Sequence, residues 1–410
     1  MATLKSLLYL SNGNLPSKMA HTIQVAKMAQ ALSQQLENFE LVTGGDLRSA
    51  FTGMDGEFQN WYGLHRHFKL VRLPTHIKVK YPFPQDYQSY RYFKLVLLYA
   101  CLKSPSLVFT RSTLIADRLL KIGVPVLWEK HELIDDNSSS RKFFADKNFI
   151  GFVTISQRLA DRCINSGLSP EKVLVAHSGV DVQSFLPYQE KHLARQKLSL
   201  PQAEKIILYS GHLYEYKGIP TLLETARMMP ECRFVLVGGW VEDIDRVKQE
   251  CNKLNLHNVQ LVGHVTQTEL ASYLYAADVL IVPTSKYWHL GETTSPLKLF
   301  EYMVVKRPIV ASALPTIMTV LRDRENALLA EPDEPLSFKD AIANLLENPI
   351  LANNIAERAF QEVQNFTWDK RAKRIVEFSA ERLKEVDRDT ANLGKNLIRY
   401  LQQNLRAAFT

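Results

Sequence analysis

Residues 206–218, Ile206-Ile-Leu-Tyr-Ser-Gly-His-Leu-Tyr-Glu-Tyr-Lys-Gly218, have the composition of a buried β-strand followed by a glycine turn and the start of a helix. Short apolar runs of this kind alternate with helix-length amphipathic stretches along the 410-residue chain. This alternation is typical of β-α-β units and a parallel sheet. A polar segment around 183–202 interrupts the pattern, which then begins again. We therefore expect an α/β protein with two Rossmann-like, doubly wound domains that face each other across a cleft.

The predicted strands divide between the two halves of the chain. They span 6–10, 40–43, 70–73, 107–110, 125–128, 151–155 and 173–176 in the first half, and 205–209, 233–237, 259–261, 279–282, 309–311 and 327–330 in the second. We expect an N-terminal domain over 1–182 and a C-terminal domain over 183–366. A long final helix over 367–410, with Thr367 as its N-cap, is expected to pack back on the first domain.

Composition and targeting signals bound the class of protein. Hydrophobic residues make up 46% of the chain and charged residues 23%, which is enough apolar material for two cores. The four cysteines form no C-x-x-C pair, which favours free thiols in a reducing compartment. The apolar run at 5–10 is too short for a signal peptide, and no stretch approaches the roughly 20 apolar residues of a membrane span. We expect a cytoplasmic protein, at most peripheral on the inner face of the membrane.

Positive charge is concentrated in the first half of the chain. The whole formal net charge of +7 falls within residues 1–187. This is either a solvated basic face or an attraction to an anionic acceptor or membrane surface. No nucleic-acid partner is expected, because no binding motif accompanies the charge. The basic and aromatic stretch 78–94 has the same two interpretations: ordinary packing, or a membrane-interface contact that receives a lipid-linked acceptor.

The most informative candidate site lies in residues 288–303. Ligands of open parallel sheets bind beyond the carboxyl ends of the strands, and this segment follows a predicted strand. Ser295 predicts a helix N-cap, with Pro296 as the first helical residue. The backbone amides of Leu297 and Lys298 then point out of the positive end of the helix, which is a ready phosphate site.

Glu301 lies one turn further along the same predicted helix, on an otherwise apolar face. A carboxylate there needs partners, because burying it unpaired would cost several kcal/mol. The vicinal hydroxyls of a ribose would supply them, at about the phosphate-to-ribose distance from the helix start. The alternative is a buried ion pair with Arg307.

Other strand ends carry weaker signals. Lys217 places a cation at a helix mouth, or is an ordinary solvated lysine, and Gly211 permits close approach of the backbone to a ligand. Gly238 and Val265 lie in turns that are either plain or suited to a nucleobase. His131, just beyond a strand, is either structural or an active-site residue. A loose glycine loop at 11–14, with Gly13, does not by itself indicate a dinucleotide.

Together these segments resemble the donor-binding signature of the retaining GT-B glycosyltransferases of family 4. The resemblance rests on Ser295-Pro-Leu-Lys-Leu-Phe-Glu-Tyr-Met303, Arg307-Pro-Ile-Val-Ala-Ser312, Ser210-Gly211, Lys217-Gly218, Leu236-Val-Gly-Gly239 and 273–283, with a crossover at 178–187. It covers roughly 150–370 well and the first 150 residues only loosely. It implies a GT-B fold, a nucleotide-sugar donor and a glycan or lipid-linked acceptor.

The resemblance also implies roles for individual residues. Glu301 corresponds to the second glutamate of the family's E-x7-E motif, which holds the ribose, and Lys217 to the diphosphate-binding lysine. His131 corresponds to a histidine that contacts the transferred sugar. The remaining donor-binding residues implied are Gly13, Ser210, Gly211, His212, Gly238, Val265, Thr293, Thr294, Ser295, Pro296, Leu297 and Lys298.

Two positions depart from the family pattern. Thr293 stands where the first glutamate of E-x7-E would fall, and Glu292 precedes it. His212 stands where relatives often carry arginine after the Ser-Gly pair. These departures bear on the contact to the hydroxyls of the donor sugar, and so on which donor is used.

The implied chemistry is loss of a nucleoside diphosphate from the anomeric carbon with retention of configuration. Positive potential is the main requirement, and Lys217, His212 if protonated, and the helix mouth at Ser295 would supply it. No metal or cofactor is expected. Two rivals stay open. One is a sugar-nucleotide 2-epimerase of the same architecture, although no set of acid/base carboxylates is evident. The other is a non-catalytic sugar-nucleotide or glycan-binding module, which Thr293 and His212 would favour.

Overall fold

The chain forms two compact units. The computed structural model describes residues 4–17, 19–46, 53–76, 85–132, 142–288, 291, 293–385 and 393–407. Contacts within the chain separate unit 1, residues 1–177 with 368–410, from unit 2, residues 178–367. The expected domain boundary at 182–183 falls at the short 3-10 helix η2 (Val182–Phe185), inside unit 2.

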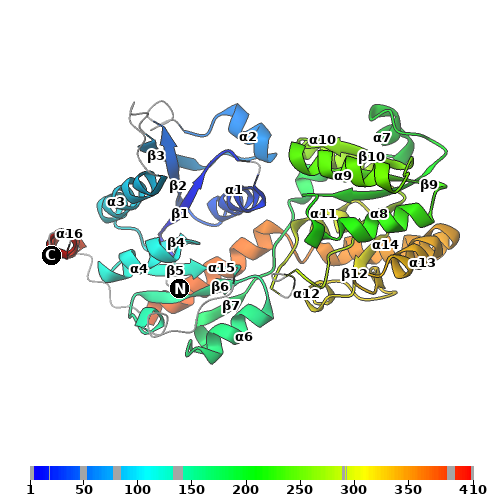
Figure 1. Cartoon of the computed structure of the whole chain (residues 1–410). Helices are drawn as coiled ribbons and strands as arrows, with labels where there is room; N and C mark the ends of the chain where they lie inside the picture. Colours follow the sequence, from blue (N-terminus) through cyan, green and yellow to red (C-terminus); the bar gives the residue numbers. More distant parts are fainter. Residues whose placement is uncertain are drawn as a thin grey trace. The chain divides into compact units, whose positions relative to one another are not determined.

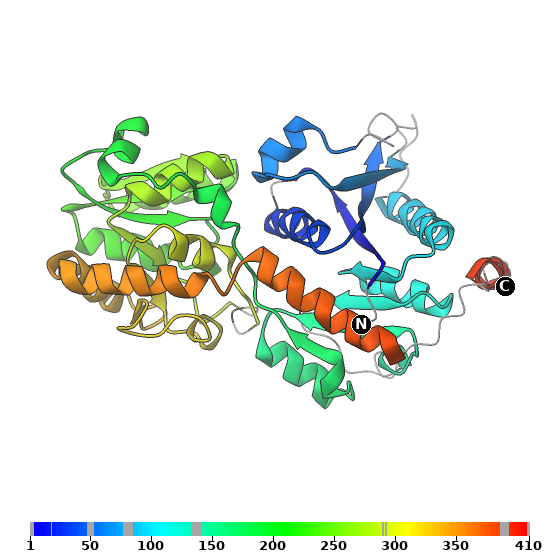
Figure 2. The ribbon, with the colours of Figure 1, turned by 180° about the vertical axis from the view of Figure 1, so that it is seen from behind.

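Unit 1 is built on a seven-stranded sheet in the order β3-β2-β1-β4-β5-β6-β7 (Figure 1), and its strand pairs are parallel. Helices α3 and α4 pack on one face, α16 packs on α3, and α15 packs on α1 (Figure 2). The elements are β1 (Ser6–Asn14), α1 (Ala20–Ser33), β2 (Asn38–Asp46), α2 (Gly56–Tyr62), β3 (Lys69–His76), α3 (Gln85–Lys103), β4 (Leu107–Thr110), α4 (Thr113–Lys121), β5 (Val126–Glu129), β6 (Phe149–Thr154), α6 (Gln157–Asn165), β7 (Val173–Val175), α15 (Trp368–Arg382) and α16 (Leu393–Ala407).

Unit 2 has a six-stranded parallel sheet in the order β10-β9-β8-β11-β12-β13. The strand order reverses between β8 and β11, which defines the point where ligands bind in such sheets. The elements are α7 (Lys191–Lys197), β8 (Lys205–Ser210), η3 (Glu215–Lys217), α8 (Ile219–Met228), β9 (Cys232–Val237), α9 (Val241–Lys253), β10 (Val259–Gly263), α10 (Gln267–Ala276), β11 (Val279–Val282), α11 (Leu297–Val304), β12 (Ile309–Ser312), α12 (Pro315–Met318), β13 (Leu328–Ala330), α13 (Pro335–Glu347) and α14 (Pro349–Val363).

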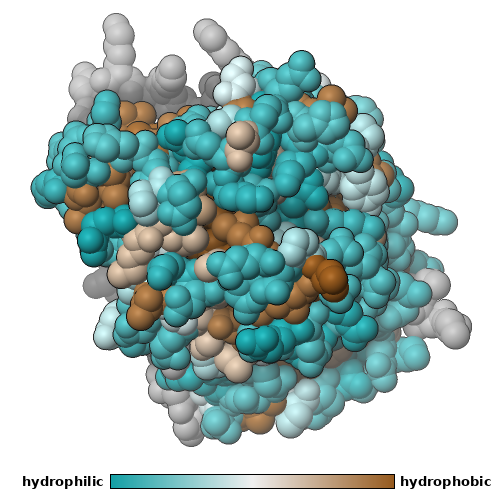
Figure 3. Space-filling view, turned by 90° about the vertical axis from the view of Figure 1, so that its right-hand side faces the viewer, coloured by the Kyte–Doolittle hydropathy of each residue, from teal (hydrophilic) through white to brown (hydrophobic). Residues whose placement is uncertain are grey.

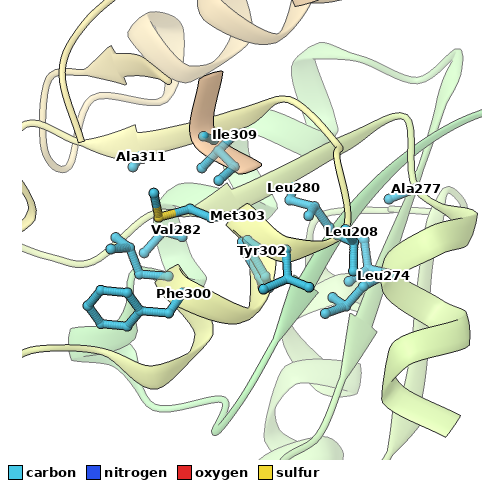
Figure 4. Packing of buried hydrophobic residues seen from close by; sticks show 14 of the residues in the cluster. Leu208, Leu274, Ala277, Leu280, Val282, Phe300, Tyr302, Met303, Ile309 and Ala311 are labelled. Carbon is cyan, nitrogen blue, oxygen red and sulfur yellow. The ribbon is translucent and has the colours of Figure 1, made fainter. Parts of the chain in front are cut away.

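Both faces of the unit 2 sheet are covered, which explains why its strands are continuous apolar runs. Along β8, Ile206 and Leu208 pack into one cluster with α10 and α11, while Ile207 and Tyr209 pack into another with α8, α9 and α13. Figure 4 shows how Phe300, Tyr302 and Met303 of α11 enter the first cluster beside residues of β8, β11 and β12. This packing fixes α11 against the carboxyl end of the sheet.

The strand predictions hold in both units, with ends that shift by a few residues. The loop expected at 11–14 was wrong: these residues are the end of β1, and Gly13 lies within the strand. The long final helix appears as α15, the 3-10 turn η4 (Leu383–Glu385) and α16, and residues 386–392 lie outside the described ranges.

The surface gives no sign of a membrane-spanning segment within the described residues. None of the helices there combines the length and the apolar character that crossing a bilayer requires. Figure 3 shows a face on which hydrophilic side chains predominate and hydrophobic ones lie in small groups between them. In the expected interfacial stretch 78–94, residues 78–84 lie outside the described ranges, and the rest belongs to the start of α3.

Candidate functional site

Glycines bring the loops beyond three strands of unit 2 into close contact. The Gly211 N–H donates to the Val237 carbonyl at 2.8 Å, and the Gly238 N–H donates to the Gly263 carbonyl at 2.7 Å. Gly238 has φ +112°, and a Cβ placed on it would lie 2.5 Å from the Gly211 carbonyl oxygen. Only glycine fits at this position, because any other residue would be strained by the positive φ and would clash with the Gly211 carbonyl. Gly238 therefore has a structural role at the carboxyl edge of β8, β9 and β10.

Helix α11 begins one residue later than the sequence predicts. Pro296 is extended (φ −64°, ψ 126°) and is itself the N-cap, so the first helical residue is Leu297. Ser295 as the N-cap was therefore wrong: its Oγ instead accepts a hydrogen bond from the Ser178 N–H at 3.1 Å. The amides of Leu297 and Lys298 still open the helix, where the helix dipole favours an anion.

Lys217 ends the short helix η3, directly before Gly218 and α8. Its Nζ lies 3.5 Å from the centroid of the Trp288 ring and 5.4 Å from that of Tyr216. Burial lowers the pKa of Lys217 to about 8. Among the described residues it has neither a hydrogen-bond acceptor nor a carboxylate within 4.0 Å. Within the described part of the chain, this is therefore a desolvated ammonium that lacks a counter-ion.

The Lys298 side chain lies in the same region. Its Nζ is 3.7 Å from the centroid of the Tyr209 ring, and a Cβ placed on Gly211 would come within 2.9 Å of it. Burial lowers its pKa well below the usual value, the Lys217 charge lowers it further, and Glu301 opposes these effects. Sequence reasoning used only the backbone amide of Lys298. In the sequence, the sign that the Lys298 side chain belongs to the site is its position three residues before Glu301 on the predicted helix.

Glu301 is half-buried and shares the less buried side of α11 with Leu297 and Lys298. The expected apolar surroundings are present in part, because Phe300 and Val304 of the predicted apolar face are fully buried while Leu297 is half-buried. The Arg307 guanidinium, the alternative partner, donates to the Tyr275 carbonyl from Nε at 3.2 Å and from Nη2 at 2.8 Å.

Ser210 connects the end of β8 to α11. Its N–H donates to the Tyr302 Oη at 2.7 Å, and its Oγ lies 3.1 Å from the same oxygen. Ser210 is buried, so its hydroxyl is committed to this contact. Ser210 therefore positions α11 against the sheet.

His212 does not supply the positive charge that the sequence suggested. Its ring stacks between Tyr214, with centroids 5.1 Å apart, and Trp240, at 5.6 Å. Burial lowers its pKa below 6.5, and the charges of Lys217 and Lys298 lower it further. The imidazole is therefore neutral near pH 7. Its Nδ1 is buried without a hydrogen-bond partner in the described part of the chain.

The remaining predicted donor-binding residues lie around this edge. Thr293 is buried, with 2% of its surface exposed, and Thr294 is half-buried in the segment that leads into α11. Val265 is half-buried and packs on the core from the turn after β10. Glu292, like 289–290, lies outside the described residues.

His131 is held in a polar network inside unit 1. Arg111 Nη2 donates to His131 Nδ1 at 2.8 Å, so the proton lies on Nε2, which is 2.5 Å from Glu129 Oε1. Arg371 of α15 also binds that oxygen, at 2.9 Å. Burial and then the Arg111 charge lower the pKa of His131 to about 4. Both ring nitrogens are occupied, which favours the structural interpretation of this histidine.

The network was not predicted as a unit. Glu129 is buried, and its pKa is held far below the usual range by Arg371 and His131, against the opposing effect of burial. Arg111, which also contacts Gln24 at 3.1 Å, follows β4 as His131 follows β5. The three residues therefore share the carboxyl edge of the unit 1 sheet, a placement that only the strand ends in the sequence could have suggested.

Comparisons with known proteins agree with the resemblance found in the sequence. Residues 190–362, which lie within unit 2, match the family model Glycosyl transferases group 1. Curated relatives include D-inositol 3-phosphate glycosyltransferase of Nocardioides sp., 28% identical over 227 residues that cover 51% of this chain and 48% of that protein. Another is an uncharacterized glycosyltransferase of Methanocaldococcus jannaschii, 26% identical, with 55% and 58% covered. The chain spans about half the length of the curated relatives it matches.

Solved structures confirm the fold over nearly the whole chain. Sucrose-phosphate synthase from Thermosynechococcus elongatus superposes with a TM-score of 0.70 at 20% identity, covering 90% of this chain and 97% of that one. Anabaena HepE in complex with UDP gives a TM-score of 0.68 at 16% identity, covering 91% and 98%. The two Rossmann-like units are those of a GT-B glycosyltransferase fold.

Proposed function

We propose that this protein transfers a hexose from a nucleoside diphosphate sugar to a glycan or lipid-linked acceptor, with retention of configuration, in the synthesis of a cell-surface polysaccharide or glycolipid. The observation that carries the proposal is the Lys217 ammonium, which is desolvated and has no counter-ion among the described residues. It lies near the start of α11, at the strand-order reversal of unit 2. A diphosphate would supply the missing anion.

The donor is bound in unit 2 under this proposal. The amides at the start of α11 and Lys217 hold the diphosphate, because backbone donors and a buried cation stabilise negative charge most strongly where water is excluded. Glu301, one turn along α11, accepts hydrogen bonds from the ribose hydroxyls. Anabaena HepE, which shares the fold, was solved in complex with UDP and with UDP-glucose, so we propose UDP-glucose as the first donor to test.

Catalysis would depend mainly on charge stabilisation. Negative charge grows on the leaving nucleoside diphosphate, and Lys217 with the α11 amides lowers the barrier to its departure. The acceptor hydroxyl attacks on the leaving-group face, and a donor phosphate oxygen takes its proton. The proposal needs no metal. A peripheral contact of unit 1 with an anionic membrane would bring a lipid-linked acceptor to the enzyme.

A thermal-shift screen of the full chain with UDP, GDP, ADP and their sugars tests the donor, because a ligand that binds only the folded state raises the melting temperature. We expect a rise with one nucleoside diphosphate and its sugar. Incubation with that sugar nucleotide alone then separates the alternatives. Slow release of free sugar supports a transferase, whereas an epimerised sugar nucleotide identifies an epimerase. Binding with no turnover, with or without acceptors, would identify a binding module.

A further inference from the structure

His212 does not supply a positive charge to the proposed diphosphate site. The family resemblance implies an arginine at this position, near the lysine that corresponds to Lys217, and two cations suit the two phosphates of a leaving group. His212 is stacked between Tyr214 and Trp240 and is neutral near pH 7. Its ring therefore cannot replace the arginine charge.

Lys298 places a second ammonium beside the same loop. Its Nζ lies against Gly211, the residue before His212, as shown by the 2.9 Å distance from Nζ to a Cβ placed on that glycine. The face of the Tyr209 ring at 3.7 Å supports the ammonium from the side of β8. Within the described ranges, Lys298 has no hydrogen-bond acceptor and no carboxylate within 4.0 Å. Its position in the first turn of α11 also places it next to the helix amides.

We propose that Lys298 is the second diphosphate-binding cation of this site, in place of residue 212, and that a proton from solvent is taken up by the Lys217–Lys298 pair when the anion binds. The inference rests on the proposed function, because it concerns the same nucleoside diphosphate. It assigns Lys298 as a binding residue through its side chain and explains how the chain tolerates a histidine at position 212.

Proton uptake follows from the surroundings of Lys298. The charged and titratable groups near it in the described structure are Lys217 from η3, Glu301 from α11, Tyr209 from β8 and His212 from the loop after β8. Burial and the Lys217 charge lower its pKa, and Glu301 only partly opposes them. A bound diphosphate adds negative charge and raises the pKa of both lysines. The free site therefore lacks part of a proton that the occupied site holds, and affinity falls as pH rises.

Isothermal titration calorimetry of the full chain with inorganic pyrophosphate and with UDP tests the assignment. Near pH 7 we expect Lys298→Met to weaken pyrophosphate binding by about tenfold or more, since it removes one charge-assisted contact. Lys298→Arg should bind within about threefold of wild type, because the charge is kept. Lys286→Met, which removes an exposed lysine in the loop after β11, is the matched control and should bind like wild type.

The pH dependence separates a titrating lysine from a structural one. Arginine stays protonated, so the ratio of wild-type to Lys298→Arg affinity cancels the ionisation of the ligand. Because the pKa of Lys298 is lowered, we expect this ratio to fall as pH rises towards the ordinary lysine value of about 10.4. Buffers of different ionisation enthalpy should show net proton uptake near pH 8 that decreases in Lys298→Arg. An unchanged ratio, or uptake that is the same in both proteins, would overturn the proton-uptake part of the proposal.

The outcomes show separately whether the role of Lys298 fails or the proposed function itself fails. If wild type binds neither pyrophosphate nor any of UDP, GDP and ADP, the proposed function fails. If wild type binds pyrophosphate and one of these nucleotides and a folded Lys298→Met binds them equally well, only the role of Lys298 fails, and the Lys217 site stands. Circular dichroism of each variant establishes that it is folded.

Discussion

Replacing Lys217 by methionine separates a binding role for this lysine from a structural one, because the two roles predict opposite changes in stability. Methionine keeps most of the aliphatic length and removes the charge. The Lys217 ammonium is desolvated, faces the Trp288 and Tyr216 rings, and has no counter-ion among the described residues. If its charge serves a ligand, desolvation of the ammonium destabilises the ligand-free protein, and the variant lacks this destabilisation. A lysine held for structure would instead lose stabilising contacts.

The expected increase in the free energy of unfolding follows from the pKa of Lys217, which is lowered from 10.5 to about 8. Each unit corresponds to about 1.4 kcal/mol, so the upper limit is about 3.5 kcal/mol before solvent screening. The lost cation–π contact offsets on the order of 1 kcal/mol of it. We expect Lys217→Met to raise the free energy of unfolding at pH 7 by on the order of 1 kcal/mol while turnover falls about 100-fold or more.

The direction of the pKa shift decides how the stability difference between the two proteins changes with pH. The folded-state pKa lies below the unfolded one, so the cost is fully present below about pH 8 and disappears as pH rises towards 10.5. Urea unfolding of both proteins between about pH 7 and about pH 10 measures this difference. Lys286→Met is the control for losing a lysine. A variant that loses stability at pH 7, or that keeps normal turnover, would refute the reasoning.

Four further predictions concern the ribose contact, a tightly packed glycine, a buried ion pair and the need for a metal. Glu301→Ala should weaken UDP binding by about tenfold but leave pyrophosphate binding within about threefold, because the carboxylate is assigned to the ribose; equal losses for both ligands in calorimetry would contradict this. Gly218→Ala should lower the urea midpoint sharply, since the new Cβ would lie 1.6 Å from the Pro283 carbonyl oxygen at φ +81°; an unchanged midpoint would argue against this packing. Arg371→Met should cost about 3–5 kcal/mol by leaving Glu129 buried without its ion pair. Because the pKa of Glu129 is lowered, that stabilisation is present above the unfolded value near 4.3 and is lost as pH falls, so the variant should differ less from wild type in acid unfolding curves. Treatment with EDTA should leave turnover unchanged, and loss of activity that Mg²⁺ restores would show that a metal is required.

The fold was predictable because its signal is local. Strands of parallel sheets are buried on both faces, so β8 and β11 stand out as apolar runs without any knowledge of their neighbours. The glycine at 218 and the proline at 220 marked the start of α8 for similar reasons. Parts of the chain with such local signals were located to within a few residues.

The parts of the candidate site that depend on contacts between distant segments were not predictable. Ser295 has the side chain of an N-cap, but Pro296 stays extended and the hydroxyl binds Ser178, which is distant in the sequence. The state of His212 depends on rings from two loops and on two lysines. Contacts that join distant segments set charge and tautomer, and a single sequence does not reveal them.

The central claim is that the start of α11 and the lysines beside it hold a nucleoside diphosphate. A crystal structure of the full chain grown with UDP, or with whichever nucleoside diphosphate raises the melting temperature most, tests it most directly. We predict phosphate oxygens within hydrogen-bond distance of the Leu297 and Lys298 amides and of Lys217 Nζ, with the ribose on Glu301. A nucleotide bound at another edge of the sheet, with Lys217 still facing only Trp288, would contradict the account.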